Sequence, residues 1–300
     1  MPAVELSHIT KTFGPLKAVD DVSFVIEKGG LFGLLGPNGA GKTTGIRVML
    51  DIFKPDSGTV SILGGPMDES KKDRIGYMPE ERGLYQDIPL ERCLTYLGSL
   101  KGLSPAEAKR RSETYLERFD LTAYKNKKVK ELSKGIQQKA QVIATILHQP
   151  ELLIVDEPFG GLDPVNTQMV KDQLREQQEQ GVTIILCSHQ MQQVEELCDR
   201  IVLIDHGKVM LYGNLADIRR QFSANVVVVR ARSPLPELQG VERAEPVNGS
   251  VKLHLAPGTQ PQELLKALVA RDVALEQFEI AMPTLDEIFI RVVSGEGGTA

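Results

Sequence analysis

The chain has 300 residues, of which 41% are hydrophobic and 25% are charged, and its formal net charge is −5. This length suggests one large domain or two smaller ones, and the composition is typical of a folded globular protein. The acidic balance argues against a protein that binds nucleic acid through bulk positive charge. The longest apolar runs, such as residues 182–187 and 226–229, are far too short to cross a bilayer.

The start of the chain lacks the basic and apolar regions of a signal peptide, so none is expected. Its three cysteines, Cys93, Cys187 and Cys198, are odd in number and lack metal-ligand spacing. They predict reduced thiols in a cytosolic protein. If this protein serves a membrane, it must therefore dock to a partner that spans it.

The first 220 residues predict strands that alternate with helices. Residues 4–35 read as strands broken by the turn signal Gly14-Pro15 and by Lys28-Gly29-Gly30, which precedes a buried strand. The stretch from about 87 to 148 is helical, and Ser104 to Glu107 forms a capping box there. This alternation predicts a parallel sheet with α/β layering and a helical subdomain. Further strands are expected at 58–63, 74–78, 152–155, 182–187 and 201–204.

The composition changes again near residue 222, which divides the chain into domains 1–222 and 223–300. The second domain reads as a small α+β module, with a capping box from Thr284 to Glu287. It holds seven basic and ten acidic side chains, a balance of −3 that makes a nucleic-acid role unexpected. The tail 295–300 predicts disorder. Strands are expected at 225–232, 251–255 and 273–280, and helices at 261–271 and 284–293.

A phosphate-binding loop is predicted between the strand 31–35 and the following helix. The run Gly36-Pro-Asn-Gly-Ala-Gly-Lys-Thr43 matches the pattern G-x-x-x-x-G-K-[ST] in the context that this motif requires. Lys42 would reach the β- and γ-phosphates of ATP, and the Thr43 hydroxyl would hold Mg²⁺. The residues expected to bind the nucleotide here are Gly36, Asn38, Gly39, Gly41, Lys42, Thr43 and Thr44.

Two neighbouring carboxylates, Asp156 and Glu157, end the apolar strand 152–155. Successive strand residues point to opposite sides, so the two carboxylates cannot do the same job. Asp156 would bind Mg²⁺ through water, as the acidic residue of a Walker B strand does. Glu157 would orient or deprotonate the attacking water, because like charge from the polyphosphate raises its proton affinity.

The run Leu132-Ser-Lys-Gly-Ile-Gln-Gln138 precedes a helix, with Ser133 as its N-cap and an anion site at its start. Together with the phosphate loop, it resembles the signature segment of ABC ATPases, usually Leu-Ser-Gly-Gly-Gln. Lys134 and Ile136 depart from that form, whereas Ser133 and Gly135, which approach phosphate, remain. The resemblance implies that this segment faces the nucleotide of a second copy, so that the working unit is a dimer around two ATP molecules.

The resemblance covers about residues 1–220 and assigns three further residues. Asp163 ends the run Gly-Gly-Leu-Asp and matches the D-loop that crosses the dimer. His189 follows the strand 182–187 and matches the switch histidine that touches the γ-phosphate. Phe13 matches the aromatic residue that stacks on adenine. The other histidines, at positions 8, 148, 206 and 254, have no such context.

One position departs from the family in a way that matters. Glu80 stands where the family usually has a Gln that contacts Mg²⁺ and whose loop couples to the membrane partner. A carboxylate still serves a metal, but it adds negative charge near the phosphates. The run 77–85, Lys134 and the ending Met282 to Phe289 resemble ATPases of exporters of sodium ions, antibiotics and other drugs, which pair with a separate permease.

These observations predict an α/β P-loop NTPase of the ABC type, with antiparallel N-terminal strands, a helical subdomain and a small C-terminal α+β domain. The expected function is ATP hydrolysis that drives export through a membrane permease, with the chain held peripherally at the inner face of the cell membrane. A soluble ABC ATPase that acts on DNA or ribosomes is an alternative, but the chain has neither a long coiled coil nor a second phosphate loop. A non-catalytic nucleotide sensor is disfavoured by Glu157 and His189.

Overall fold

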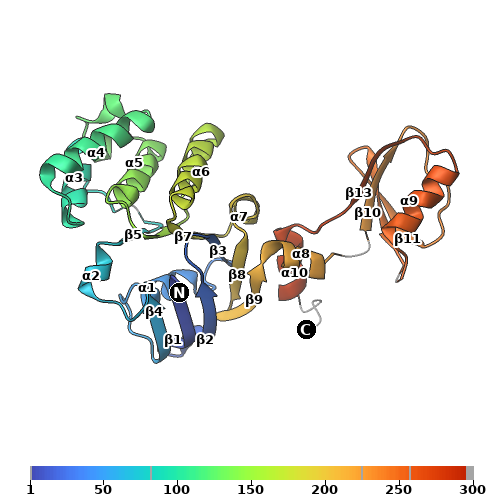
Figure 1. Ribbon diagram of the computed structural model, residues 1–300, viewed down its shortest axis with the longest axis horizontal. Helices are drawn as coiled ribbons and strands as arrows, with labels where there is room; N and C mark the ends of the chain where they lie inside the picture. The colour runs from blue at the N-terminus through green and yellow to red at the C-terminus, as the bar shows by residue number, and fades with distance from the viewer. Residues whose placement is uncertain (1, 82, 224–225, 257, 295–300) are drawn as a thin grey trace. The chain divides into compact units, whose positions relative to one another are not determined.

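The computed structural model describes residues 2–81, 83–223, 226–256 and 258–294. The chain forms two compact units, Met1–Asn214 and Leu215–Ala300 (Figure 1). Within the described ranges, no helix has the length and hydrophobicity needed to span a membrane. The tail for which disorder was expected lies outside the described residues.

A central sheet organises the first unit, with strand order β5-β6-β7-β3-β8-β9. Neighbouring strands are parallel up to β8, and β9 pairs with β8 in the antiparallel sense. Every residue of β3, β6 and β7 is buried, which explains why their sequences are mostly apolar. The strands are β3 (Leu31–Leu35), β5 (Ile75–Met78), β6 (Leu152–Asp156), β7 (Thr183–Ser188), β8 (Arg200–Asp205) and β9 (Lys208–Asn214).

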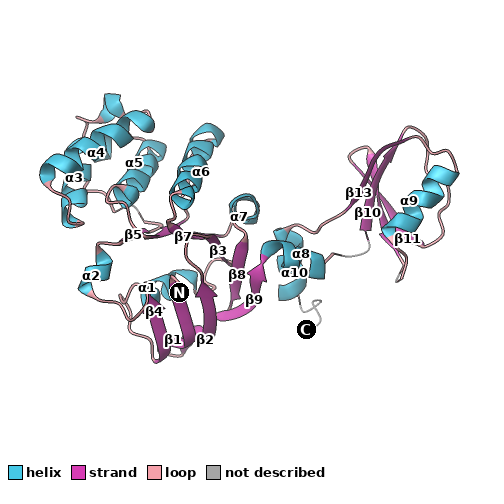
Figure 2. Cartoon of the chain, viewed as in Figure 1, coloured by secondary structure: helices cyan, strands magenta, loops and turns pink. Residues whose placement is uncertain are grey.

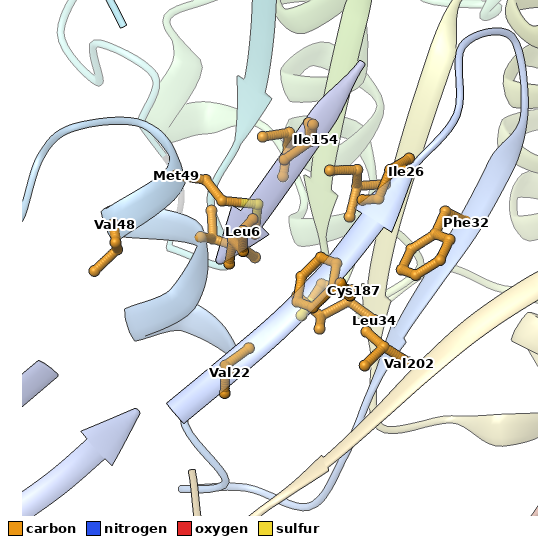
Figure 3. Close-up of a cluster of buried hydrophobic side chains, with 14 of the residues drawn as sticks. Leu6, Val22, Ile26, Phe32, Leu34, Val48, Met49, Ile154, Cys187 and Val202 are labelled. Atoms are coloured by element: carbon orange, nitrogen blue, oxygen red, sulfur yellow. The ribbon is translucent and has the colours of Figure 1, made fainter. Parts of the chain in front are cut away.

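An antiparallel sheet, in the order β2-β1-β4, accompanies the central sheet. It consists of β1 (Val4–Phe13), β2 (Leu16–Ile26) and β4 (Ser57–Ile62), and Gly14 makes the tight turn between β1 and β2 with φ of 59°. Side chains from both sheets and from the first helix form one core. Figure 3 shows Leu6 and Ile26 of the antiparallel sheet near Met49 and Ile154. The antiparallel N-terminal strands of the expected fold are confirmed.

Helices α3, α4 and α5 occupy the stretch that was expected to form a helical subdomain, and they lie together in Figure 2. Ser104 caps α4, with its hydroxyl accepting from the Glu107 amide at 3.2 Å. The helices of the first unit are α1 (Lys42–Met49), α2 (Glu69–Lys72), α3 (Leu90–Leu100), α4 (Pro105–Arg118), α5 (Lys134–Ile146), α6 (Pro164–Glu179) and α7 (Met191–Leu197), with 3₁₀ turns at Thr122–Tyr124 and Val129–Glu131.

The second unit combines an antiparallel sheet, in the order β11-β12-β10-β13, with helices α8, α9 and α10. Leu264 and Leu268 of α9 pack into its small core with Val227 and Val229 of β10. Thr284 and Glu287 form the expected capping box at the start of α10. The elements are α8 (Leu215–Gln221), β10 (Val226–Ala231), β11 (Val241–Val247), β12 (Ser250–Leu255), α9 (Pro261–Ala270), β13 (Leu275–Ile280) and α10 (Leu285–Val293).

The boundary between the units lies eight residues before the position expected from composition, at 214/215 instead of 222/223. Helix α8 belongs to the second unit because its end bonds to the segment around α10. Arg219 donates to the Pro283 carbonyl at 2.9 Å, and Arg291 donates to the Phe222 carbonyl at 3.1 Å. These contacts join residues about 65 positions apart in sequence, so local composition cannot reveal them.

Candidate nucleotide-binding site

The carboxyl ends of three parallel strands lie at the same level in the central sheet. Leu35 of β3 pairs with Ser188 of β7, and Asp156 of β6 pairs with Cys187. The loops that follow these strands therefore begin side by side. Ligands of open α/β sheets bind at such carboxyl ends.

A cleft of about 490 Å³ opens at this edge. It is lined by the phosphate loop, the start of α1, the ends of β1 and β6 and the turn between β8 and β9. Most residues that the sequence assigned to nucleotide or metal meet here, although they are spread over 145 positions. Those that line the cleft are Phe13, Asn38, Gly39, Gly41, Lys42, Thr43, Thr44, Glu80, Asp156 and Glu157.

Two glycines of the loop, Gly36 and Gly41, are required by its close approach to neighbouring strands. Gly41 has φ of 105°, and a Cβ there would lie 2.1 Å from the carbonyl oxygen of Ala18. Gly36 has φ of 152°, and a Cβ there would lie 2.1 Å from the carbonyl oxygen of Ile204. Only glycine tolerates both restrictions. The loop therefore lies close to the backbone of β2 and of β8, and α1 begins directly after it.

Lys42 begins α1 and is buried, with its side chain folded over the loop. Its ammonium donates to the carbonyls of Gly36 at 2.7 Å and Pro37 at 3.0 Å. An ammonium has three donors, so a third can go to an anion in the cleft. The N-terminal end of α1 adds free backbone N–H groups and the positive end of its dipole. The cleft is therefore suited to a polyphosphate.

Thr43 and Asp156 face each other at the base of the cleft, and the Thr43 hydroxyl donates to the Asp156 carboxylate at 3.2 Å. Burial raises the pKa of the Asp156 carboxyl, while hydrogen bonds from Cys187 and Thr43 oppose this. A nearby cation would favour the ionised carboxylate. Hydroxyl and carboxylate oxygens, with phosphate oxygens, are the ligands that Mg²⁺ prefers, so this pair and the neighbouring Glu80 fit that ion.

Glu157 has an unusual backbone conformation, and both oxygens of its carboxylate accept hydrogen bonds. Its φ is +50°, a left-handed conformation that costs about 1–3 kcal/mol for a residue with a Cβ. One carboxylate oxygen accepts from the His189 amide at 2.7 Å and lies 2.6 Å from His189 Nδ1. The other accepts from the Ser188 hydroxyl at 3.1 Å. Since an ionised carboxylate only accepts, Nδ1 of His189 carries the proton. The histidine does not itself line the cleft.

Phe13 and Leu16 add an aromatic and an apolar side chain to the lining of the cleft. Phe13, at the end of β1, is 44% exposed and packs edge-on against Phe53 with ring centroids 5.4 Å apart. Lys11 lies over the Phe13 ring, 5.6 Å from its centroid. One face of the ring remains available for a planar base.

Sequence reasoning missed several residues that line the cleft: Leu16, Lys17, Ala18, Ala40, His206 and Gly207. His206 has no sequence context like that of His189, yet it lines the cleft. It lies in the turn between β8 and β9, and this turn is attached to the phosphate loop because Gly207 donates to the Ala40 carbonyl at 2.9 Å. Strand β9 was itself not predicted, although the apolar runs on either side of His206 and Gly207 are typical of a β-hairpin.

Besides Gly36 and His189, three of the expected residues do not line the cleft. The Ser133 hydroxyl caps α5 by accepting from the Ile136 amide at 3.4 Å, and Asp163 caps α6 by accepting from the Asn166 amide at 2.9 Å. Gly135 lies beside the loop that precedes α6, since a Cβ there would be 3.5 Å from the Gly161 carbonyl oxygen. The signature segment and the D-loop are thus neighbours, and neither lines the cleft of its own chain.

Comparisons with known proteins agree with this geometry. A family model described as ABC transporter matches residues 19–160, and one described as ATP-binding protein DrrA1-3-like, C-terminal domain, matches residues 213–293. The uncharacterized ABC transporter ATP-binding protein YhaQ of Bacillus subtilis is 43% identical over 96% of this chain and 97% of its own length.

Nod factor export ATP-binding protein I of Sinorhizobium fredii is 32% identical over 98% of this chain and 87% of its own length. A solved structure described as the ATP-binding subunit of an ABC transporter has a TM-score of 0.69 and 34% identity, and the match covers 73% of this chain and 93% of that one. The P-loop NTPase fold of the ABC type is thereby confirmed. The chain therefore belongs to the ABC transporter ATP-binding proteins, a family of ATPases.

Proposed function

We propose that two copies of this chain close around two ATP molecules and that ATP hydrolysis drives export through a separate membrane permease. Membership of the transporter ATP-binding family supports a transport role over one on DNA or ribosomes. Export is supported by the similarity to a protein named for Nod factor export and by the DrrA-like C-terminal domain. In this proposal the chain sits at the inner face of the cell membrane, attached through the permease.

The proposed dimer rests on one observation: two sets of residues suited to bind phosphate lie apart from each other in the same chain. The cleft gathers the phosphate loop, Asp156 and Glu157 on one side of the nucleotide. Ser133 and Gly135, which have the chemistry to meet phosphate, lie elsewhere on the same chain beside the D-loop. A second copy, turned to face the first, would bring its signature segment over the open cleft, so that each ATP is held by both chains.

In the proposed mechanism, Lys42 and the start of α1 bind the β- and γ-phosphates and offset their charge. Thr43, Asp156 and Glu80 would hold Mg²⁺, which supplies a positive charge on the phosphate oxygens during transfer. Phe13 stacks on the adenine, and Asn38, Gly39, Gly41 and Thr44 complete the phosphate cradle.

Glu157 acts as the base that takes a proton from the attacking water. His189 holds its carboxylate through the amide and Nδ1. In the imidazolium form both ring nitrogens donate, so His189 could hold Glu157 and the γ-phosphate together. This arrangement would couple the base to the presence of the phosphate that it helps to remove.

The experiment that tests the proposal replaces Glu157 with Gln. This change keeps the shape of the side chain but removes the base, so turnover should fall by on the order of 10²-fold or more. ATP should still bind and hold two chains together. Size-exclusion chromatography with ATP and Mg²⁺ should then show a stable dimer for Glu157→Gln and a mostly monomeric wild type.

A matched control is Glu151→Gln, since Glu151 forms an ion pair with Arg74 away from the cleft. It should hydrolyse ATP at the rate of the wild type. Undiminished turnover in Glu157→Gln would remove the base assignment, and a variant that stays monomeric with ATP bound would contradict the dimer.

A further inference from the structure

Gln138 links the signature helix to the residue that follows β6. It lies on α5, a little more than one turn after Ser133, and is 4% exposed. Its side-chain amide nitrogen donates to the carbonyl of Glu157 at 3.2 Å and to the carbonyl of Pro158 at 3.0 Å. Gln138 does not line the cleft, so it cannot touch the nucleotide directly.

One of the carbonyls that Gln138 holds belongs to Glu157, a residue of the site with a strained backbone. With φ of +50°, the Glu157 backbone persists only where its surroundings fix it. Its amide donates to the Cys187 carbonyl at 2.9 Å, which fixes the side toward β7. Its carbonyl accepts from the Gly160 amide at 3.3 Å and from Gln138. Gln138 is thus the side chain that fixes Glu157 from the side of the helical subdomain.

We infer that Gln138 is a positioning residue for ATP hydrolysis. It keeps the Glu157–Pro158 backbone in the conformation that aims the Glu157 carboxylate at the cleft. This inference rests on the proposed role of Glu157 as the base. Because Ser133 and Gln138 share one helix, a shift of the signature segment would also reach the base of the same chain through this contact.

A variant that removes the donor but keeps the volume separates this role from packing. Gln138→Met leaves the Pro158 carbonyl without its side-chain donor and Glu157 with one donor fewer. A small misplacement of a reacting group costs up to about 10²-fold in rate, and we expect the basal kcat of the full chain to fall by about tenfold. The KM for ATP should stay within about twofold of the wild type, since the cleft itself is unchanged.

The matched control is Thr145→Val on the same helix. Thr145 is also buried, and its hydroxyl donates to the Gln141 carbonyl within α5 at 2.7 Å, with no contact to Glu157. This isosteric change removes one buried hydrogen bond of α5 and should leave kcat within about twofold. If both variants lower kcat equally, Gln138 acts only through the stability of the helix, and the inference is overturned.

A double variant tests whether Gln138 acts through Glu157. Once Glu157→Gln has removed the base, adding Gln138→Met should lower the residual rate by less than about twofold, because coupled residues are not additive. A further tenfold loss would overturn the inference. If instead the proposed function is wrong, the Glu157→Gln variant should hydrolyse ATP at the rate of the wild type. An inactive Glu157→Gln with a fully active Gln138→Met would refute the inference alone.

Discussion

The two units of this chain both pack helices against a sheet, but they place their polar side chains differently. In the first unit, the buried Lys42 and Asp156 converge on one cleft with an exposed Phe13 at its open end. In the second unit, described polar groups pair with each other, as Arg230 does with Ser250 at 3.1 Å and Arg232 with Glu276 at 3.1 Å. All residues that line the nucleotide cleft come from the first unit.

The difference extends to the cores. The first unit has a core that joins two sheets and α1, so it can carry the strained Glu157 and the buried charges of the site. The core of the second unit is built from a few side chains of β10, β12 and α9. A small core contributes limited stability. The comparison teaches that the residues lining the nucleotide cleft and the larger core belong to the same unit.

The largest effect is expected when one of the buried polar side chains that line the cleft of the first unit is removed. Lys42→Met removes the ammonium that bonds the loop carbonyls and would bind the phosphates. Losing charged hydrogen bonds to phosphate should weaken the binding of a non-hydrolysable ATP analogue by on the order of 10²-fold. Isothermal titration calorimetry measures this directly.

Lys71→Met is the control for Lys42→Met. Lys71 is another buried lysine, and it donates to the Pro66 carbonyl at 2.7 Å, away from the cleft. It should bind the analogue as the wild type does. Equal losses in both variants would mean that Lys42 matters only for the stability of the fold.

A smaller effect is expected at Glu80, where the chain departs from its family. Glu80→Gln keeps an oxygen ligand and should be tolerated, whereas Glu80→Ala removes it. The Mg²⁺ concentration for half-maximal turnover should then rise by about tenfold. Titrating Mg²⁺ at fixed ATP measures this change. An alanine variant with normal Mg²⁺ dependence would show that Glu80 lines the cleft without serving the metal.

The smallest effect is expected on nucleotide affinity when the second unit is removed. This change tests the comparison between the two units. A chain of residues 1–214 ends at the structural boundary and leaves the first unit whole. Its affinity for the ATP analogue should stay within about twofold of the full chain, because all the residues that line the cleft belong to the first unit. Calorimetry, with circular dichroism to check folding, measures this. A folded chain 1–214 that cannot bind nucleotide would refute the division.

A chain that ends at residue 222 provides a useful contrast. It keeps α8 but removes α10 and the bonds from Arg219 and Arg291 that hold α8 in place. It should be less stable or more prone to aggregate than the chain 1–214. Equal stability would indicate that α8 belongs with the first unit after all.

Much of the site could be predicted from sequence because its signals are local. The phosphate loop is one continuous run, from Gly36 to Thr43, so its motif can be recognised without knowledge of any distant contact. The caps at Ser104, Ser133 and Thr284 follow from residues three positions apart. Asp156 ends a short apolar run, which is typical of a strand that is buried on both faces. Its burial could therefore also be predicted from the local sequence.

Only the tertiary structure decided which distant segments complete the site and where the units divide. His206 and Gly207 reach the cleft because β9 pairs with β8 and the turn between these strands is bonded to Ala40 of the phosphate loop. The boundary at 214/215 follows from α8 bonding beyond residue 280. Glu157 has a left-handed backbone, and its carbonyl accepts a bond from Gln138 because α5 lies against the segment that follows β6. Local sequence determines conformations and caps through neighbouring atoms, whereas these features depend on partners that only the folded chain brings together.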